Sequence, residues 1–149
     1  MFVFYDVNRF RYTSLLEKTF PNWSKKLFST MSDLLNAINE VDIDEYGKFK
    51  YVLIDVQDAS SKKLIVRGYA RAQWHADIFE ETERKVKELG KDLKTNCLGG
   101  GRILHDPDEK TLKVFGYSQG YGKADHEVTV SILKKKYPDY NITWSDEGY

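Results

Sequence analysis

The sequence has few of the features that would place a protein in a membrane, in an oxidising compartment or on a nucleic acid. It has a single cysteine, Cys97, which rules out an internal disulfide and a cysteine-based zinc site. Basic and acidic residues both total 23, so no basic excess favours nucleic acid. No apolar run is long enough to span a bilayer, and no segment has the pattern of a signal peptide. These absences predict a cytoplasmic protein that binds neither nucleic acid nor membrane, with a monomer as the default state.

What the sequence does contain is the composition of one folded domain. The chain has 149 residues, of which 41% are hydrophobic and 31% charged, enough for one core but not for two. Residues 1–40 lack strand alternation, although apolar residues from Leu27 to Ile38 recur at helical spacing. We therefore expect a partly disordered N-terminal extension over residues 1–40, with a short helix in it, and a folded domain over residues 41–149.

Regular patterns occupy the chain from Val41 onward. Apolar spacing predicts a helix over residues 75–89, ended by Gly90, and a second over residues 125–136, ended before Pro138. Short runs rich in β-branched and aromatic residues predict strands over residues 48–56, 62–69, 96–104, 111–117 and 140–144. Two helices interspersed among about five or six strands, some joined by short turns, predict a single α+β domain.

His75 is the first candidate for a catalytic side chain. It stands where the second predicted strand leads into the first predicted helix, and a helix N-terminus carries partial positive charge. That field favours the neutral imidazole, which is the form that a general base or a nitrogen nucleophile needs. A capping or packing histidine is the alternative, and the local sequence alone favours it.

Two glycine-containing segments are suited to contact with an anion. The loop YSQGYGKADH, residues 117–126, runs into the second predicted helix, but it lacks the glycine spacing and the ending of a P-loop. A plain loop with Asp125 as the helix cap is an equal alternative. The segment CLGGGRILH, residues 97–105, places three glycines in a strand, which is typical of a bulge or of close backbone approach. Arg102 follows directly and is suited to bidentate phosphate contact.

A cysteine phosphatase loop and a histidine metal site are two alternatives to a phosphate site at His75. The spacing from Cys97 to Arg102 is one residue short of a cysteine phosphatase loop and lies in a predicted strand, so we expect a buried, inert thiol. The three histidines, His75, His105 and His126, have neither cysteine partners nor paired spacing, so a metal site is the weaker hypothesis.

Five blocks occur in order between Val41 and the C-terminus: VDIDEYGKFKYVLI, VRGYARAQWHADIFE, CLGGGRILH, VFGYSQGYGKADH and KYPDYNITWSDEGY. Together they resemble the phosphohistidine phosphatase family, also called the janus/ocnus family, and within it the insect janus-A type. Residues 1–40 lie outside the resemblance. Because five ordered blocks match, the resemblance is far more specific than any single motif.

The resemblance implies a hydrolase without a cofactor that acts on histidine-phosphorylated proteins, built on a mixed sheet flanked by two helices. It implies that His75 is the catalytic proton acceptor, that Lys50 contacts the substrate phosphate, and that Arg102 is the arginine that follows the family's glycines. Lys50 by its strand position alone would be an ordinary solvent-facing lysine. The family's substrate-binding loop is matched by Ser118, Gln119 and Gly120, of which the last two depart from the mammalian-type pattern.

Together these features predict a metal-independent phosphohistidine phosphatase in which His75 acts as a general base rather than as a nucleophile. The first alternative is a non-catalytic phosphate-binding regulator, since janus proteins are linked to sex-specific development. The second is a metal-dependent hydrolase that uses His75, His105 and His126.

Overall fold

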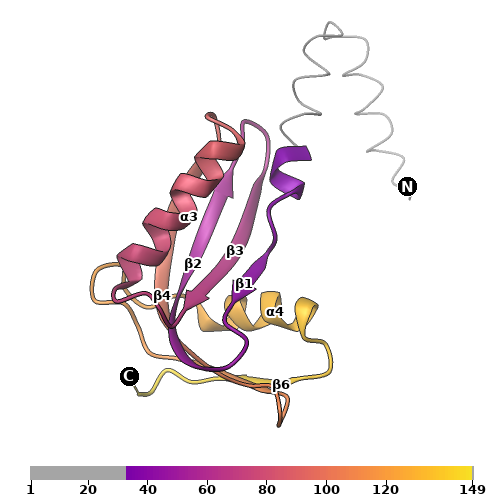
Figure 1. Ribbon diagram of the computed structural model, residues 1–149, viewed down its shortest axis with the longest axis vertical. Helices are drawn as coiled ribbons and strands as arrows, with labels where there is room; N and C mark the ends of the chain where they lie inside the picture. Colours follow the sequence, from indigo (N-terminus) through magenta and orange to yellow (C-terminus); the bar gives the residue numbers. More distant parts are fainter. Residues whose placement is uncertain (1–32, 149) are drawn as a thin grey trace, which may run out of the picture.

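The computed structural model describes residues 33–148, whose strands form one sheet (Figure 1). In chain order the elements are β1 (Val41–Ile43), β2 (Gly47–Gln57), β3 (Lys62–Tyr69), α3 (His75–Leu89), β4 (Lys94–Asp106), β5 (Thr111–Phe115), α4 (His126–Lys136) and β6 (Asn141–Trp144). The strand order across the six-stranded sheet is β1-β3-β2-β4-β5-β6. The β1–β3 and β5–β6 pairs are parallel and the other pairs are antiparallel. The predicted α+β domain with a mixed sheet is therefore confirmed.

The predicted elements agree with the structure except at some ends and at one short strand. β3 and α3 have the predicted bounds. β4 is longer at both ends than residues 96–104, and β5 is shorter than residues 111–117 because Gly116 follows it with a φ of 73°. α4 begins one residue late because Asp125 is its N-cap and accepts a hydrogen bond through its side chain. β1 has only three residues, too few for a period-two pattern, and the sequence does not predict it.

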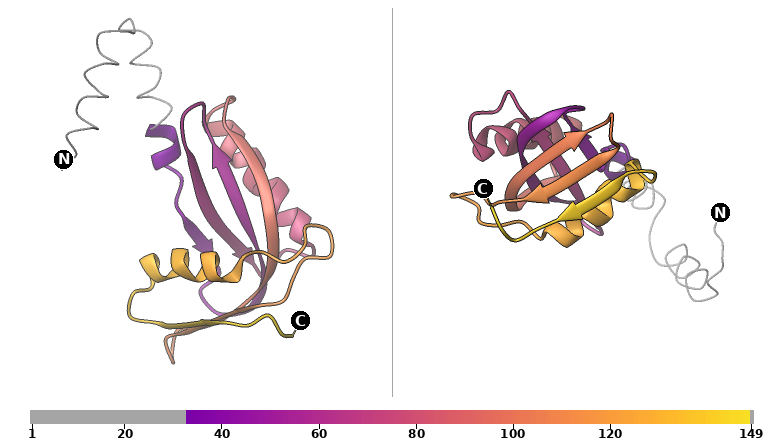
Figure 2. Two further views of the ribbon diagram at one scale, coloured as in Figure 1. Left: turned by 180° about the vertical axis from the view of Figure 1, so that it is seen from behind. Right: turned by 90° about the horizontal axis from the view of Figure 1, so that it is seen from below.

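The two helices cover opposite faces of the sheet (Figure 2). Strand alternation divides the side chains of β2 between these faces. Val52, Ile54 and Val56 join the cluster that contains Ile78 and Val86 of α3, and we call this side the α3 face. The opposite α4 face is formed by Phe49, Tyr51 and Leu53 of β2 with Val130, Ile132 and Leu133 of α4. No helix in the described part of the chain is long and apolar enough to cross a bilayer.

The residues just before β1 pack against the sheet. Leu35 and Ile38 are buried in the cluster of the α3 face, and residues 33–36 are helical. The Lys63 ammonium donates hydrogen bonds to the carbonyls of both residues, and Arg67 donates to the Asn39 carbonyl at 2.8 Å. The packed structure therefore begins before Val41. The rest of the expected extension and most of its expected helix lie outside the described residues.

Candidate functional site

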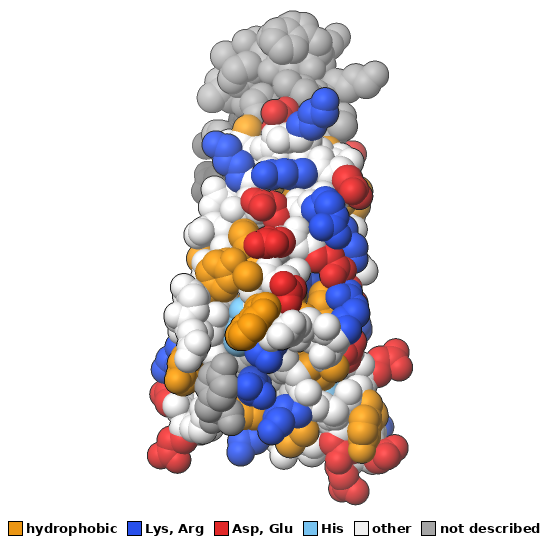
Figure 3. All heavy atoms as spheres, turned by 60° about the vertical axis from the view of Figure 1, so that its left-hand side comes forward, with side chains coloured by type: hydrophobic (Ala, Val, Ile, Leu, Met, Phe, Trp, Pro, Cys, Tyr) orange, Lys and Arg blue, Asp and Glu red, His pale blue; other side chains and the backbone are white. Residues whose placement is uncertain are grey.

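Lys50 and Arg102 lie side by side in the sheet. They are directly paired across β2 and β4, and strand alternation places both on the α3 face. Both side chains are half-buried. Figure 3 shows basic side chains gathered on this side of the molecule, next to a small area of histidine surface and several hydrophobic side chains. The pairing thus places two cationic groups together at one end of α3.

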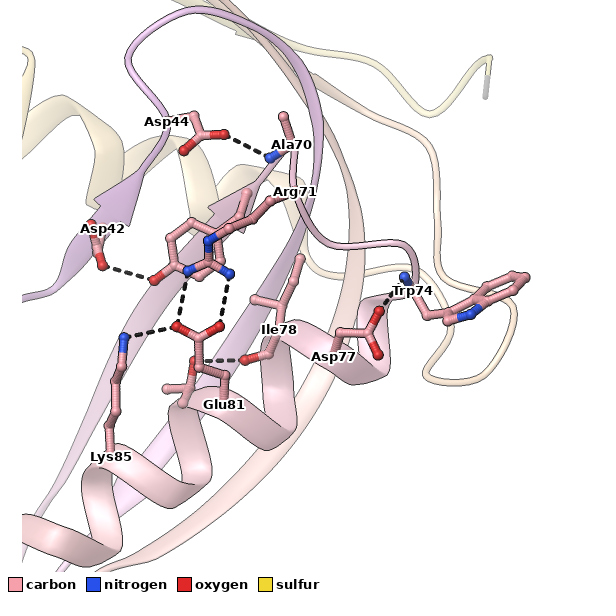
Figure 4. A network of polar contacts seen from close by, with 11 residues as sticks. Asp42, Asp44, Ala70, Arg71, Trp74, Asp77, Ile78, Glu81 and Lys85 are labelled. Atoms are coloured by element: carbon pink, nitrogen blue, oxygen red, sulfur yellow. Dashed lines mark hydrogen bonds and ion pairs between the residues drawn. The ribbon is translucent and has the colours of Figure 1, made fainter.

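The connection from β3 to α3 is held by a network of polar contacts (Figure 4). Arg71 forms a two-bond ion pair with Glu81, at 2.8 and 2.9 Å, and lies 4.2 Å from the centroid of the Tyr69 ring. Arg71 and then Lys85 lower the pKa of Glu81 to about 2, so the carboxylate stays charged. The Trp74 N–H donates to the Asp77 carboxylate at 2.8 Å and caps the helix. These contacts fix the first turn of α3, where His75 is the first residue.

The hydrogen bond of His75 defines which ring nitrogen carries the proton. The side chain is buried, and its Nε2 lies 2.9 Å from the Gly101 carbonyl oxygen. Because a carbonyl only accepts, Nε2 carries the hydrogen and Nδ1 of the neutral ring keeps a lone pair. No residue of the described chain makes a hydrogen bond to Nδ1. The ring is therefore held by one nitrogen and leaves the other available as a base.

The surroundings of His75 favour the neutral imidazole. Burial lowers its pKa below the ordinary value of 6.5, and the positive charges of Lys50 and Arg102 lower it further. The bond to the Gly101 carbonyl acts in the opposite direction, but the net shift is downward. The lowered pKa thus favours the neutral imidazole, with a free lone pair on Nδ1, which is the form that a general base needs. The same two cations are suited to holding a phosphoryl group.

The three glycines of β4 are explained by close packing against its backbone. A Cβ at Gly100 would lie 2.7 Å from His75 Cδ2 and 3.1 Å from Ser118 Cβ. At Gly99, where the pairing with β2 shifts register and φ is 141°, a Cβ would lie 2.7 Å from the Ala124 backbone nitrogen. Both explanations offered by the sequence, a bulge and a close approach, therefore apply. The absence of side chains lets His75 and Ser118 approach the same strand.

The loop after β5 folds back on itself and onto β4. Ser118 and Gly122 exchange backbone hydrogen bonds of 3.1 and 2.8 Å, and the Tyr121 N–H donates to Ser118 Oγ at 3.2 Å. Ser118 is buried, whereas Gln119 and Gly120 are exposed at the tip. Within residues 33–148 the backbone N–H groups of Gln119 and Gly120 make no hydrogen bond. The loop bonds to Gly100 of β4, the strand that carries Arg102, and presents two backbone donors, an arrangement suited to an anion.

Comparison with known proteins identifies the family of this chain. The profile of the Janus/Ocnus family matches residues 35–141. This chain belongs to the Janus/Ocnus family. Its Janus/Ocnus relatives include the sex-regulated protein janus-A of Drosophila simulans, 53% identical over 126 residues that cover 83% of this chain and 92% of the relative. Janus-A of Drosophila melanogaster is 52% identical with the same coverage, and the 14 kDa phosphohistidine phosphatase of Sus scrofa is 46% identical over 122 residues, covering 77% and 95%.

The other two histidines of this Janus/Ocnus protein lie in separate hydrogen-bond networks. His126 Nε2 donates to the Gly116 carbonyl at 2.8 Å, and its Nδ1 accepts from the Tyr51 hydroxyl at 2.6 Å. His105 Nδ1 donates to the Asp44 carbonyl at 2.8 Å. Among the described residues, no three His, Cys, Asp or Glu side chains are grouped to hold a metal ion. The structure therefore does not bring the three histidines together as the metal hypothesis requires.

Cys97 lies in β4, as the sequence indicates, and not in a loop that leads into a helix. Its thiol is half-buried and lies 3.7 Å from the Gly99 carbonyl oxygen. Burial raises its pKa, which disfavours the nucleophilic thiolate. The geometry gives no support to a cysteine phosphatase.

Sequence reasoning missed the residues that hold the site in place. The spacing of Glu81 and Lys85 by four residues was a visible signal for a helical ion pair, although nothing in it identifies Arg71 as a third member. The bond between Tyr51 and His126 joins residues 75 positions apart. Such a contact has no signal in a single sequence.

Proposed function

We propose that this Janus/Ocnus protein is a metal-independent phosphatase that hydrolyses the P–N bond of phosphohistidine in proteins. The observation that carries the proposal is the hydrogen bond from His75 Nε2 to the Gly101 carbonyl, which leaves Nδ1 as the proton acceptor beside Lys50 and Arg102. The 46% identity to a protein named as a phosphohistidine phosphatase supports the choice of substrate. As part of the same proposal, the protein acts as a monomer in the cytoplasm on histidine-phosphorylated proteins.

The proposed reaction is the attack of water on phosphorus. Lys50, Arg102 and the backbone N–H groups of Gln119 and Gly120 hold the phosphoryl oxygens, and Ser118 anchors that loop. His75 Nδ1 takes one proton from the water as its oxygen bonds to phosphorus. The electron pair of the P–N bond stays on the substrate imidazole, which takes a proton from solvent, and His75 then releases the proton it took to solvent. Positioned positive charge stabilises the oxygens of the transferred group, which is the main requirement in phosphoryl transfer.

The test is phosphate release from a histidine-phosphorylated protein in the presence of EDTA, comparing wild type with His75→Ala. We expect the wild type to be unaffected by EDTA and the variant to lose activity by about 10²–10⁴-fold, the range for a lost general base. Circular dichroism should show the variant folded. Undiminished turnover in His75→Ala would contradict the role of His75, and loss of wild-type activity in EDTA would favour the metal hypothesis.

A non-catalytic phosphate-binding regulator is the second candidate. It is favoured by the janus-A relatives, which are named as sex-regulated proteins and share higher identity with this chain than the phosphatase does. The same phosphate-binding groups serve both candidates. Stable binding of a histidine-phosphorylated protein by the wild type, with no phosphate released, would identify the regulator.

A further inference from the structure

Trp74 is a large aromatic side chain exposed beside His75. It is 60% exposed, although its backbone is fixed by the cap of α3. Figure 4 shows the indole standing away from the helix, and no ring contact or side-chain hydrogen bond joins it to another described residue. A single exposed apolar residue is common on protein surfaces. Trp74 differs from other exposed apolar residues because it is next in sequence to His75, the proposed base, and its exposure is therefore relevant to substrate binding.

The first turn of α3 and the loop after β5 stand on either side of the site. His75 and Ser118 both pack against Gly100. The ring centroids of Phe79 in α3 and Tyr121 in the loop are 5.7 Å apart. Figures 1 and 2 show this loop next to the N-terminal end of α3 from both sides. Trp74 directly precedes His75, so the edge of the site at the start of α3 includes this exposed residue.

The chemistry of the proposed reaction places an aromatic ring at that edge. In a displacement at phosphorus the attacking and leaving atoms are roughly in line. With the water at His75 Nδ1, the leaving imidazole lies on the far side of phosphorus, away from the buried histidine and toward solvent. Imidazole is aromatic, and once protonated it is a cation. Indole is the side chain best suited to stack on either form.

We propose that Trp74 is a specificity-determining residue that stacks against the imidazole of the substrate. It selects phosphohistidine over phosphorylated aliphatic amines, whose leaving groups offer no ring. This inference rests on the proposed phosphatase function and names the part of the substrate that the site distinguishes.

The test compares two small substrates with the same phosphoryl group and different leaving groups, phosphoimidazole and phosphoramidate. Trp74→Ala should lower kcat/KM for phosphoimidazole by about 3- to 10-fold, mainly through KM, and change it less than about twofold for phosphoramidate. Trp74→Phe should keep most of the activity because it retains a ring. The matched control is Trp144→Ala, since Trp144 is 43% exposed on β6 and pairs with Val114 of the α4 face.

Each result separates the inference from the proposal beneath it. Stacking would be supported if Trp74→Ala lowers kcat/KM for phosphoimidazole selectively, Trp74→Phe restores it, and Trp144→Ala leaves it unchanged. The same holds if the wild type turns over phosphoimidazole but not phosphoramidate. An unchanged kcat/KM in Trp74→Ala, or an equal loss on both substrates, would overturn it while leaving the phosphatase intact. A wild type that releases phosphate from neither compound would overturn the phosphatase function, and the inference with it.

Discussion

His75 and His126 occupy nearly equivalent positions on opposite faces of one sheet. Each is the first residue of its helix, each is buried, and each donates its Nε2–H to the carbonyl of a glycine. Burial is the largest cause of a lowered pKa in both. They differ at Nδ1, which accepts a hydrogen bond from the Tyr51 hydroxyl in His126 and has no described partner in His75. Burial and a helix N-terminus therefore do not make a histidine a catalytic candidate, whereas an open nitrogen does.

The charges around the two rings also differ. Lys50 and Arg102 both lower the pKa of His75, and no carboxylate among residues 33–148 opposes them. Near His126 the effect of Lys123 is opposed by Asp146 and Asp125. Among the described residues, the charges that shift the pKa of His75 are thus all positive, whereas those that shift the pKa of His126 are of both signs.

The largest expected effect on stability comes from removing His126, the histidine of the pair whose two ring nitrogens are both hydrogen-bonded. His126→Ala empties a buried site, removes the donor to the Gly116 carbonyl and leaves the Tyr51 hydroxyl with Thr129 Oγ1 as its remaining partner. We therefore expect a loss of about 2–5 kcal/mol in the free energy of unfolding. Urea denaturation measures this loss. Phosphate release per folded molecule, assayed well below the midpoint of unfolding, should stay within about tenfold of wild type. A variant that is folded but inactive would show that His126 takes part in the chemistry and would remove the contrast.

A smaller change tests the same network without emptying the site. Burial raises the pKa of Tyr51, so its hydroxyl stays protonated and donates to His126. Tyr51→Phe leaves the buried Nδ1 of His126 without its donor, and we expect a loss of about 1–3 kcal/mol in stability, seen as a Tm several degrees lower by calorimetry. Tyr46→Phe is the matched control because Tyr46 is 70% exposed. Equal Tm values for the two variants would mean that the buried bond adds no stability.

The smallest expected effect sharpens the electrostatic difference. Lys50→Gln removes one of the charges that lower the pKa of His75, so that pKa should rise. Activity that needs the neutral imidazole is lost as pH falls through this value, so the acidic limb of the kcat/KM profile should move upward by roughly 0.3–0.8 pH units. The position of the limb is read independently of the lower overall rate that losing a phosphate ligand causes. Lys91→Gln, at an exposed position, serves as the control, and a limb that does not move would exclude Lys50 as a cause.

The sequence predicts the scaffold more completely than the site. The 15 residues of α3 show enough apolar periodicity to define both ends, whereas the three residues of β1 do not. The run Gly99–Gly101 signals a bulge or a close approach, but not which side chains approach. The proton position on His75 depends on a carbonyl 26 residues away, and that contact exists only once β4 has paired with β2. The local spacing of apolar residues predicts where α3 begins, whereas the unbonded Nδ1 of His75 results from tertiary contacts.

Gly100 and Gly101 make β4 unusually thin between its two faces, because neither residue has a side chain. A Cβ at Gly100 would lie 2.7 Å from His75, and one at Gly101 would lie 2.8 Å from His126. The peptide unit between Gly100 and Gly101 thus lies between His75 and His126, and both rings pack against it. The position of the base is then set by an interior strand of the sheet, because β4 is paired on both sides, with β2 and β5.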